Sequence, residues 1–205
     1  MTTENKIYFY PLWLRIWHGI NALGIITLII TGITMNSGME SSFISFKLNI
    51  QLHNFAGAIV TLNYFLFALG NLFTNNKSFY IIKPKNFLKR PLKQAYYYAW
   101  GMFHGMKAPY PLSEKRKFNP LQKYTYVAVM YLVVPLVIIT GIGLMFPELI
   151  FNKIYNISGV LITAVTHSAM GFFISIFLII HLYIASIGKS PLENFKSILS
   201  GWHHV

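Results

Sequence analysis

Four long stretches of this chain carry almost no charged side chains. They cover residues 12–35, 53–73, 124–146 and 159–187, and Arg15 is the only Asp, Glu, Lys or Arg within them. About 20 apolar residues in a helix cross the hydrocarbon core of a bilayer, and only helices or closed barrels satisfy their backbone there. The sequence therefore predicts an all-α integral membrane protein, a bundle of four transmembrane helices forming one domain over residues 1–205.

The composition agrees with a membrane environment and restricts the chemistry. Charged residues make up 11% of the chain, whereas soluble domains carry about a quarter. The chain has no cysteine, which excludes disulfides, thiolate zinc sites, cysteine-bound iron–sulfur clusters and covalently attached haem c. Any cofactor must therefore be held by His, Met or backbone groups.

The basic residues predict how the bundle is oriented. The 17 Lys and Arg outweigh the 5 Asp and Glu by +12, and the connections 36–52 and 147–158 carry one basic residue each, Lys47 and Lys153. The positive-inside rule then places the long loop 74–123 and both termini in the cytoplasm. Because these charges lie beside apolar spans, they indicate orientation rather than nucleic-acid binding. The basic residues of the loop are Lys77, Lys83, Lys85, Lys89, Arg90, Lys93, Lys107, Lys115, Arg116, Lys117 and Lys123.

Within this loop, residues 87–103 mix basic side chains with Tyr96, Tyr97, Tyr98 and Trp100. This mixture predicts a helix lying in the lipid headgroup layer. A solvated basic loop attracted to anionic lipid is at least as good an interpretation of these residues as a specific docking surface.

Four of the seven histidines lie inside the predicted spans, at His18, His53, His167 and His181. Ionisable side chains are costly in a membrane and mark functional sites. The 14 residues from His167 to His181 correspond to about 21 Å of helix rise and ~1400° of rotation, close to four full turns. Both rings therefore leave one face of the fourth span, near opposite ends. By depth, His18 shares the cytoplasmic level with His181, and His53 shares the outer level with His167.

Two His–His pairs, one above the other in a bundle, suit two haems that each have two imidazole axial ligands. A single zinc or copper site is excluded, because the pairs lie ~20 Å apart. A proton or ion transporter would be expected to carry carboxylates inside its spans, and these spans have none. Arg15 suits a propionate of the cytoplasmic haem and equally suits a snorkelling interface arginine. The remaining histidines, His104, His203 and His204, are expected at the solvated surface.

Three segments, together with the His167/His181 spacing, resemble the bacterial di-haem cytochrome b (cytochrome b561-like) family. The family includes the membrane cytochrome b subunits of thiosulfate reductase, formate dehydrogenase and nickel–iron hydrogenase, and the thiosulfate-reductase type is most similar. The resemblance covers essentially the whole chain. It implies the same pairing, His18 with His181 and His53 with His167, as haem iron ligands. The segments are RIWHGINA at 15–22, TG at 31–32 and FNPLQK at 118–123.

The resemblance also implies a quinone site next to the cytoplasmic haem, close to Asn119 and Gln122. Asn119 followed by Pro120 also suits a plain helix start, with Asn as N-cap, and the two interpretations are compatible. The expected function is a di-haem b electron-transfer subunit of the bacterial inner membrane. It links menaquinone or ubiquinone to a partner iron–sulfur protein or cytochrome c, and it is not the substrate-converting subunit. A stand-alone quinol-oxidising cytochrome b is the alternative, and a haem-free anchor or transporter is the alternative from another class.

Overall fold

The computed structural model describes residues 6–38, 45–82, 86–113, 116–188 and 190–204, so Lys83, Lys85 and Lys115 of the basic loop lie outside the described residues. Four helical segments of this part of the chain are long and apolar enough to cross a membrane, as the sequence predicted. The third segment runs without a break through three consecutive helical elements. The segments are α1 (Leu12–Ser37), α2 (Phe46–Phe73), α4 (Pro120–Ala128) with η3 (Val129–Val133) and α5 (Val134–Met145), and α6 (Gly159–Ala185).

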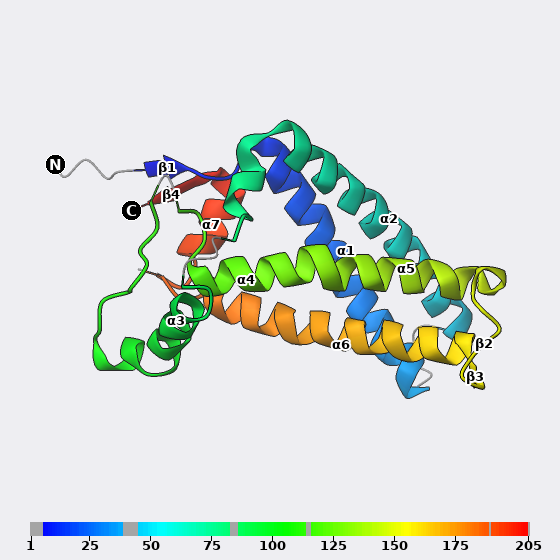
Figure 1. The fold of residues 1–205 in the computed structure, drawn as a ribbon. Helices are drawn as coiled ribbons and strands as arrows, with labels where there is room; N and C mark the ends of the chain where they lie inside the picture. The colour runs from blue at the N-terminus through cyan, green and yellow to red at the C-terminus, as the bar shows by residue number, and fades with distance from the viewer. Residues whose placement is uncertain (1–5, 39–44, 83–85, 114–115, 189, 205) are drawn as a thin grey trace.

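The four segments pack as two pairs that contact each other. Helix α1 lies along α2, and α5 lies along α6 (Figure 1). Further contacts join α1 to α6 and α2 to α5, so that each segment touches two others. Apolar side chains on all four segments point outward, as at Leu23, Leu66, Ile139 and Ile179. An apolar exterior of this extent is typical of a surface that faces lipid.

Polar groups and small residues join α1 to α2. The Trp17 indole N–H donates to the Asn63 carbonyl at 2.9 Å, and the Asn63 side chain donates to the Trp17 carbonyl at 3.0 Å. The Trp17 ring also stacks on Phe67 at a centroid distance of 4.5 Å. A Cβ on Gly24 would collide with Val60, so the close approach of the two helices requires glycine there. Small residues and paired polar side chains are the usual means of helix association in membranes.

Helix α2 begins at Phe46, seven residues before the predicted start at His53. The prediction was wrong because Lys47, Asn49 and Gln51 interrupt the apolar pattern. These residues are nevertheless helical. Asn49 is buried, and its side chain donates to the Thr31 carbonyl of α1 at 3.0 Å. His53 therefore lies two turns inside α2.

The third segment contains a π-helical turn, η3, directly before α5. Pro135 stands in the first turn of α5. Proline has no N–H to donate and its ring clashes with the preceding turn, and a wider turn next to it accommodates both effects. Such turns are rare and are often found close to functional sites.

The two ends of the bundle are closed by different structures. At one end, β2 (Lys153–Ile154) and β3 (Ile157–Ser158) form a hairpin after η4 (Pro147–Leu149). The hairpin turn uses Tyr155 and Asn156 at φ values of 48° and 65°. At the other end, β1 (Lys6–Tyr8) pairs antiparallel with β4 (Trp202–His204), which follows α7 (Glu193–Ser200). Both ends of the described chain therefore lie at the same end of the bundle (Figure 1).

The long basic loop lies at that same end (Figure 1). It contains η1 (Asn75–Phe79), α3 (Lys89–Ala99) and η2 (Gly101–His104). The helix predicted over residues 87–103 is therefore confirmed as α3 followed by a 3₁₀ turn. Its position in the headgroup layer stays a prediction.

Candidate cofactor site

His18 of α1 faces His181 of α6 at the end of the bundle that carries both termini. Their ring centroids lie 6.3 Å apart, with the ring planes inclined at 50°. We call these two residues the inner pair. His53 of α2 faces His167, also on α6, nearer the β2–β3 hairpin, and we call them the outer pair. The outer centroids lie 6.2 Å apart, with the planes inclined at 69°.

Both spacings fit a metal held between two imidazoles. A metal–imidazole bond is about 2 Å long, and the ring adds about 1 Å from its nitrogen to its centroid, so two rings on opposite faces of one ion have centroids about 6 Å apart. A haem iron takes its axial ligands in this arrangement. Within the described residues, no three His, Cys, Asp or Glu side chains gather as a metal cluster. Each pair therefore suits an ion whose other ligands come from a macrocycle.

Threonine hydroxyls orient both rings of the outer pair. Thr31 Oγ1 donates to the Thr27 carbonyl at 2.7 Å and lies 2.8 Å from Nδ1 of His53. Because the hydroxyl proton is directed to Thr27, the second contact uses the imidazole Nδ1–H as donor. This leaves the Nε2 lone pair of His53 for a metal. A partner on the other ring nitrogen is a general feature of metal-binding histidines.

The same arrangement recurs on the other side of the outer pair. Thr140 Oγ1 donates to the Leu136 carbonyl at 2.7 Å and lies 3.1 Å from Nδ1 of His167. A glycine follows each threonine in the sequence, and the one at 141 leaves room for the ring. A Cβ on Gly32 would lie 3.5 Å from Cε1 of His53, and one on Gly141 would lie 3.1 Å from Cε1 of His167.

The inner pair is held differently. Tyr126 of α4 places its hydroxyl 3.3 Å from Nδ1 of His181. Phe177 stacks on the His181 ring at a centroid distance of 5.6 Å and an angle of 23°. Thr31, Thr140 and Tyr126 were not predicted as partners of the histidines. The Thr-Gly dipeptide repeated at 31–32 and 140–141 was the signal for two of them.

Asn119 and Gln122 form the start of α4. The Asn119 carbonyl-type side-chain oxygen accepts from the Gln122 N–H at 2.9 Å, and the Gln122 side chain accepts from the Asn119 N–H at 3.1 Å. This is a capping box, with Pro120 at the first helical position. Asn119 also donates to the Tyr98 hydroxyl at 2.8 Å. The helix-start interpretation of this segment is therefore confirmed, and the quinone role of the two amides stays a prediction.

Arg15 points toward the C-terminal part of the chain. Its guanidinium donates to the Leu199 carbonyl at the end of α7. This contact joins α1 to α7. Its role as a propionate partner stays a prediction.

The three other histidines lie in different environments. His104 is exposed, as predicted, and stacks on Trp100 at 4.0 Å. The prediction for His203 was wrong, because this residue is 9% exposed and its Nδ1 lies 3.1 Å from the hydroxyl of buried Ser197. Its burial follows from the pairing of β4 with β1. The side chain of His204 lies outside the described residues.

Two comparisons relate the chain to known proteins. Residues 9–201 match the family model described as prokaryotic cytochrome b561. The chain is also 32% identical over 199 residues to the Escherichia coli (strain K12) protein named "Putative cytochrome YdhU". That alignment covers 97% of this chain and 75% of the relative. The family match includes all four long segments and both histidine pairs.

Proposed function

This chain belongs to the prokaryotic cytochrome b561 family, and from that premise we propose that it is a di-haem electron-transfer subunit connecting quinone to a partner redox protein. The family and the four membrane-capable segments make it a multi-pass membrane cytochrome of the b561 type, and the family implies haem b. Two haems, the quinone and the partner are our proposal. Electron transfer is its function, and substrate conversion belongs to another subunit.

The observation that carries the proposal is the spacing within the two histidine pairs. Centroid distances of 6.3 and 6.2 Å suit one iron between each pair. We assign His18 and His181 as axial ligands of the inner haem, and His53 and His167 as those of the outer haem. The 14 residues between the α6 histidines separate the two sites by about 21 Å of helix rise.

The bound haems supply the redox chemistry, and the chain holds, orients and insulates them. The threonines of the outer pair and Tyr126 of the inner pair fix the ring orientations. The apolar segments exclude water from both sites. An electron that enters at one level can therefore leave at the other, across most of the membrane.

The basic loop supports an orientation for this path. We propose that the inner pair lies at the cytoplasmic face of a bacterial inner membrane, where the loop and both termini lie, since basic loops are retained there. The quinone, menaquinone or ubiquinone, binds at this level, with Asn119 and Gln122 bordering its approach. Tyr126 lies on the same helix as these amides and contacts His181. The partner, an iron–sulfur protein or a cytochrome c, exchanges electrons with the haems.

A haem assay on the purified full-length protein tests the proposal. The pyridine haemochrome method should give two non-covalent haems per chain. The reduced-minus-oxidised spectrum should show sharp α and Soret bands of low-spin b haem. One haem per chain would contradict the di-haem assignment, and a flat spectrum would favour a haem-free anchor or transporter.

A further inference from the structure

Lys117 is a buried lysine, and the described residues offer its amine no hydrogen-bond acceptor. The residue is 3% exposed, and its Nζ finds no hydrogen-bond partner among the described residues. Three aromatic rings enclose the amine, with centroids at 4.5 Å for Tyr10, 5.5 Å for Phe79 and 5.6 Å for Phe118. An ammonium carries three donors, and leaving them all unpaired in an apolar setting is costly.

The rings stabilise a positive charge without accepting its protons. Cation–π attraction to three rings favours the charged form. Burial acts in the opposite direction and lowers the pKa of the Lys117 ammonium to about 7. An anionic oxygen beside Nζ would satisfy the donors and favour the charged form, because charge-assisted hydrogen bonds are among the strongest in proteins.

The carboxylates that the structure describes do not supply this oxygen. Glu148 follows α5, at the opposite end of the third segment from Lys117. Glu193 begins α7, and neither carboxylate is within hydrogen-bond distance of Nζ of Lys117. Glu4, Glu40 and Glu114 lie outside the described residues. An anionic group of a bound molecule is therefore the acceptor that fits this site.

Lys117 lies on the side of the inner pair that faces the basic loop. Its neighbour Tyr10 directly precedes Pro11, the N-cap of α1, and His18 is six residues after Leu12, about 9 Å further along the helix. Packed rings connect the two places. Phe118 contacts Tyr126 at a centroid distance of 4.9 Å, and Tyr126 reaches His181. A haem held by the inner pair carries its two propionate carboxylates on one edge of the ring.

We propose that the Lys117 ammonium binds a propionate carboxylate of the haem held between His18 and His181. This inference rests on the proposed function. Arg15, which the sequence offered for this role beside that of a snorkelling arginine, donates to the Leu199 carbonyl through one guanidinium nitrogen, and its buried Nε has no partner among the described residues. Lys117 has no such partner in the described part of the chain. The propionate satisfies the buried amine, and the amine neutralises the propionate.

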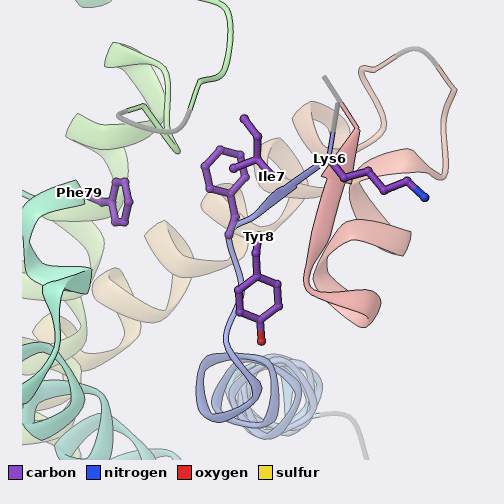
Figure 2. Close-up of a pocket in the computed structure, with 5 residues that line it drawn as sticks. Lys6, Ile7, Tyr8 and Phe79 are labelled. Carbon is purple, nitrogen blue, oxygen red and sulfur yellow. The ribbon is translucent and has the colours of Figure 1, made fainter. Parts of the chain in front are cut away.

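A pocket beside Phe79 does not supply the acceptor that the Lys117 amine lacks. Phe79 lines a pocket of about 300 Å³ together with Lys6, Ile7, Tyr8 and Phe9 (Figure 2). Lys117 is not among the described residues that line it. The ring of Phe79 lies at both places, and Lys117 itself is buried, so an ion in the pocket has little access to the amine. A molecule held inside the protein is therefore a better partner than an ion from solution.

Redox titration of the full-length protein with its haems tests the inference. Lys117→Met should lower the midpoint potential of the inner haem, because removing a nearby positive charge favours the ferric state. It should also release that haem about tenfold faster, the effect of one lost charge-assisted hydrogen bond. Lys117→Arg should restore most of both properties. Where Lys117→Met fails to accumulate, Lys117→Gln keeps a donor and removes the charge, and should show the same lowered potential.

Two controls make the result specific. The His53→Ala background retains the inner haem alone, so that the shift is assigned without spectral overlap. Lys93→Met removes an exposed positive charge from α3 and should leave both potentials unchanged.

Four outcomes overturn the inference, and one of them also overturns the proposed function. Unchanged potentials in a folded Lys117→Met protein would show that no propionate is bound. A Glu114→Gln variant that reproduces Lys117→Met would assign the amine to a carboxylate of the chain. A slower reaction with a quinol analogue at unchanged potentials would make the quinone the ligand. Absence of haem from the unmodified protein is the outcome that also refutes the di-haem function.

Discussion

The outer and inner histidine pairs have nearly the same ring spacing and different surroundings. At the outer pair, each imidazole donates to a threonine whose hydroxyl is anchored to its own helix. At the inner pair, His181 contacts Tyr126 of a neighbouring helix, and no described side chain makes a comparable contact with His18. The inner pair also lies beside the aromatic cluster around Lys117.

This difference indicates a division of roles. Threonines on the neighbouring helices α1 and α5 fix the outer ligands with little dependence on the loops. The inner ligands depend on α4, whose start is a capping box connected to Tyr98 of α3. A change in the basic loop can therefore reach the inner site through α4. We expect the outer site to act as a fixed relay and the inner site to be the one that reacts with quinone.

The largest expected effect is the loss of one haem when a ligand is removed. His53→Ala and His167→Ala should each remove the outer haem, and His18→Ala and His181→Ala the inner one, because a five-coordinate iron leaves the ring poorly anchored. The haem content per chain and the redox titration of the remaining haem measure this. The two variants of one pair should leave a haem of the same potential.

His104→Ala is the control for these ligand variants. His104 is exposed and stacks on Trp100, and its removal should leave both haems in place. Different potentials for the haem that survives in the two outer variants would contradict the pairing.

Removing a threonine hydroxyl should have the next largest effect, confined to the outer haem. Thr31→Val and Thr140→Val keep the shape and remove the acceptor of Nδ1–H. Loss of such a partner typically costs roughly 10–100-fold in metal affinity. Thr31→Val should be the stronger of the two, since its contact is 2.8 Å against 3.1 Å. Transfer of haem to apomyoglobin gives the release rates.

Thr34→Val is the matched control, because the half-buried Thr34 makes the same bond to its own helix, to the Ile30 carbonyl at 2.8 Å, without contacting a histidine in the described structure. It should release both haems at the rate of the unmodified protein. If Thr34→Val and Thr31→Val released haem at the same rate, the threonine hydroxyl would act by stabilising its own helix and not by orienting the histidine.

The sequence was sufficient for the span number and for which histidines meet. Each span must be apolar because it crosses the hydrocarbon core of the membrane. The 14-residue spacing places the rings of His167 and His181 on one face of their helix. The pairing of histidines across helices then follows from the depth of each one in the membrane. These properties depend on distance along the chain, which the sequence contains directly.

The partners of the histidines could not be obtained in the same way. Whether Thr31 or Thr34 faces His53 depends on how α1 is rotated against α2, and that rotation is set by contacts such as Trp17 with Asn63. The start of α2 was missed because Asn49, polar by composition, is buried against α1. The burial of His203 likewise depends on a pairing between opposite ends of the chain.

A smaller effect is expected at the proposed quinone approach. Gln122→Leu should slow reduction of the haems by a quinol analogue about tenfold, the effect of one lost hydrogen bond, and should leave both haem spectra intact. Stopped-flow absorbance at the α band measures the rate. Reduction at the unmodified rate, or a quinone found beside His53, would contradict the placement.

The capping box makes a control necessary for this experiment. Gln122 accepts from the Asn119 N–H, so its loss also weakens the start of α4. Asn119→Ala removes the other half of the box and should cost about 1 kcal/mol of stability. Because both amides border the proposed approach, both variants should slow the reaction by more than the lost stability explains. A rate that follows the stability alone would assign the effect to the helix start.

The smallest effect is expected from Tyr126→Phe. This variant compares the inner and outer histidine pairs most directly. The ring contacts with Phe118 and Phe177 remain, and only the hydroxyl near His181 is lost. At 3.3 Å this contact is longer than either threonine contact, and hydrogen bonds weaken with distance. The inner haem should therefore be released only a few-fold faster, less than the net effect of about 1 kcal/mol for an average hydrogen bond would give, and the outer haem should not change. An effect larger than that of Thr31→Val would reverse the comparison, because the inner histidine would then be the more firmly oriented of the two.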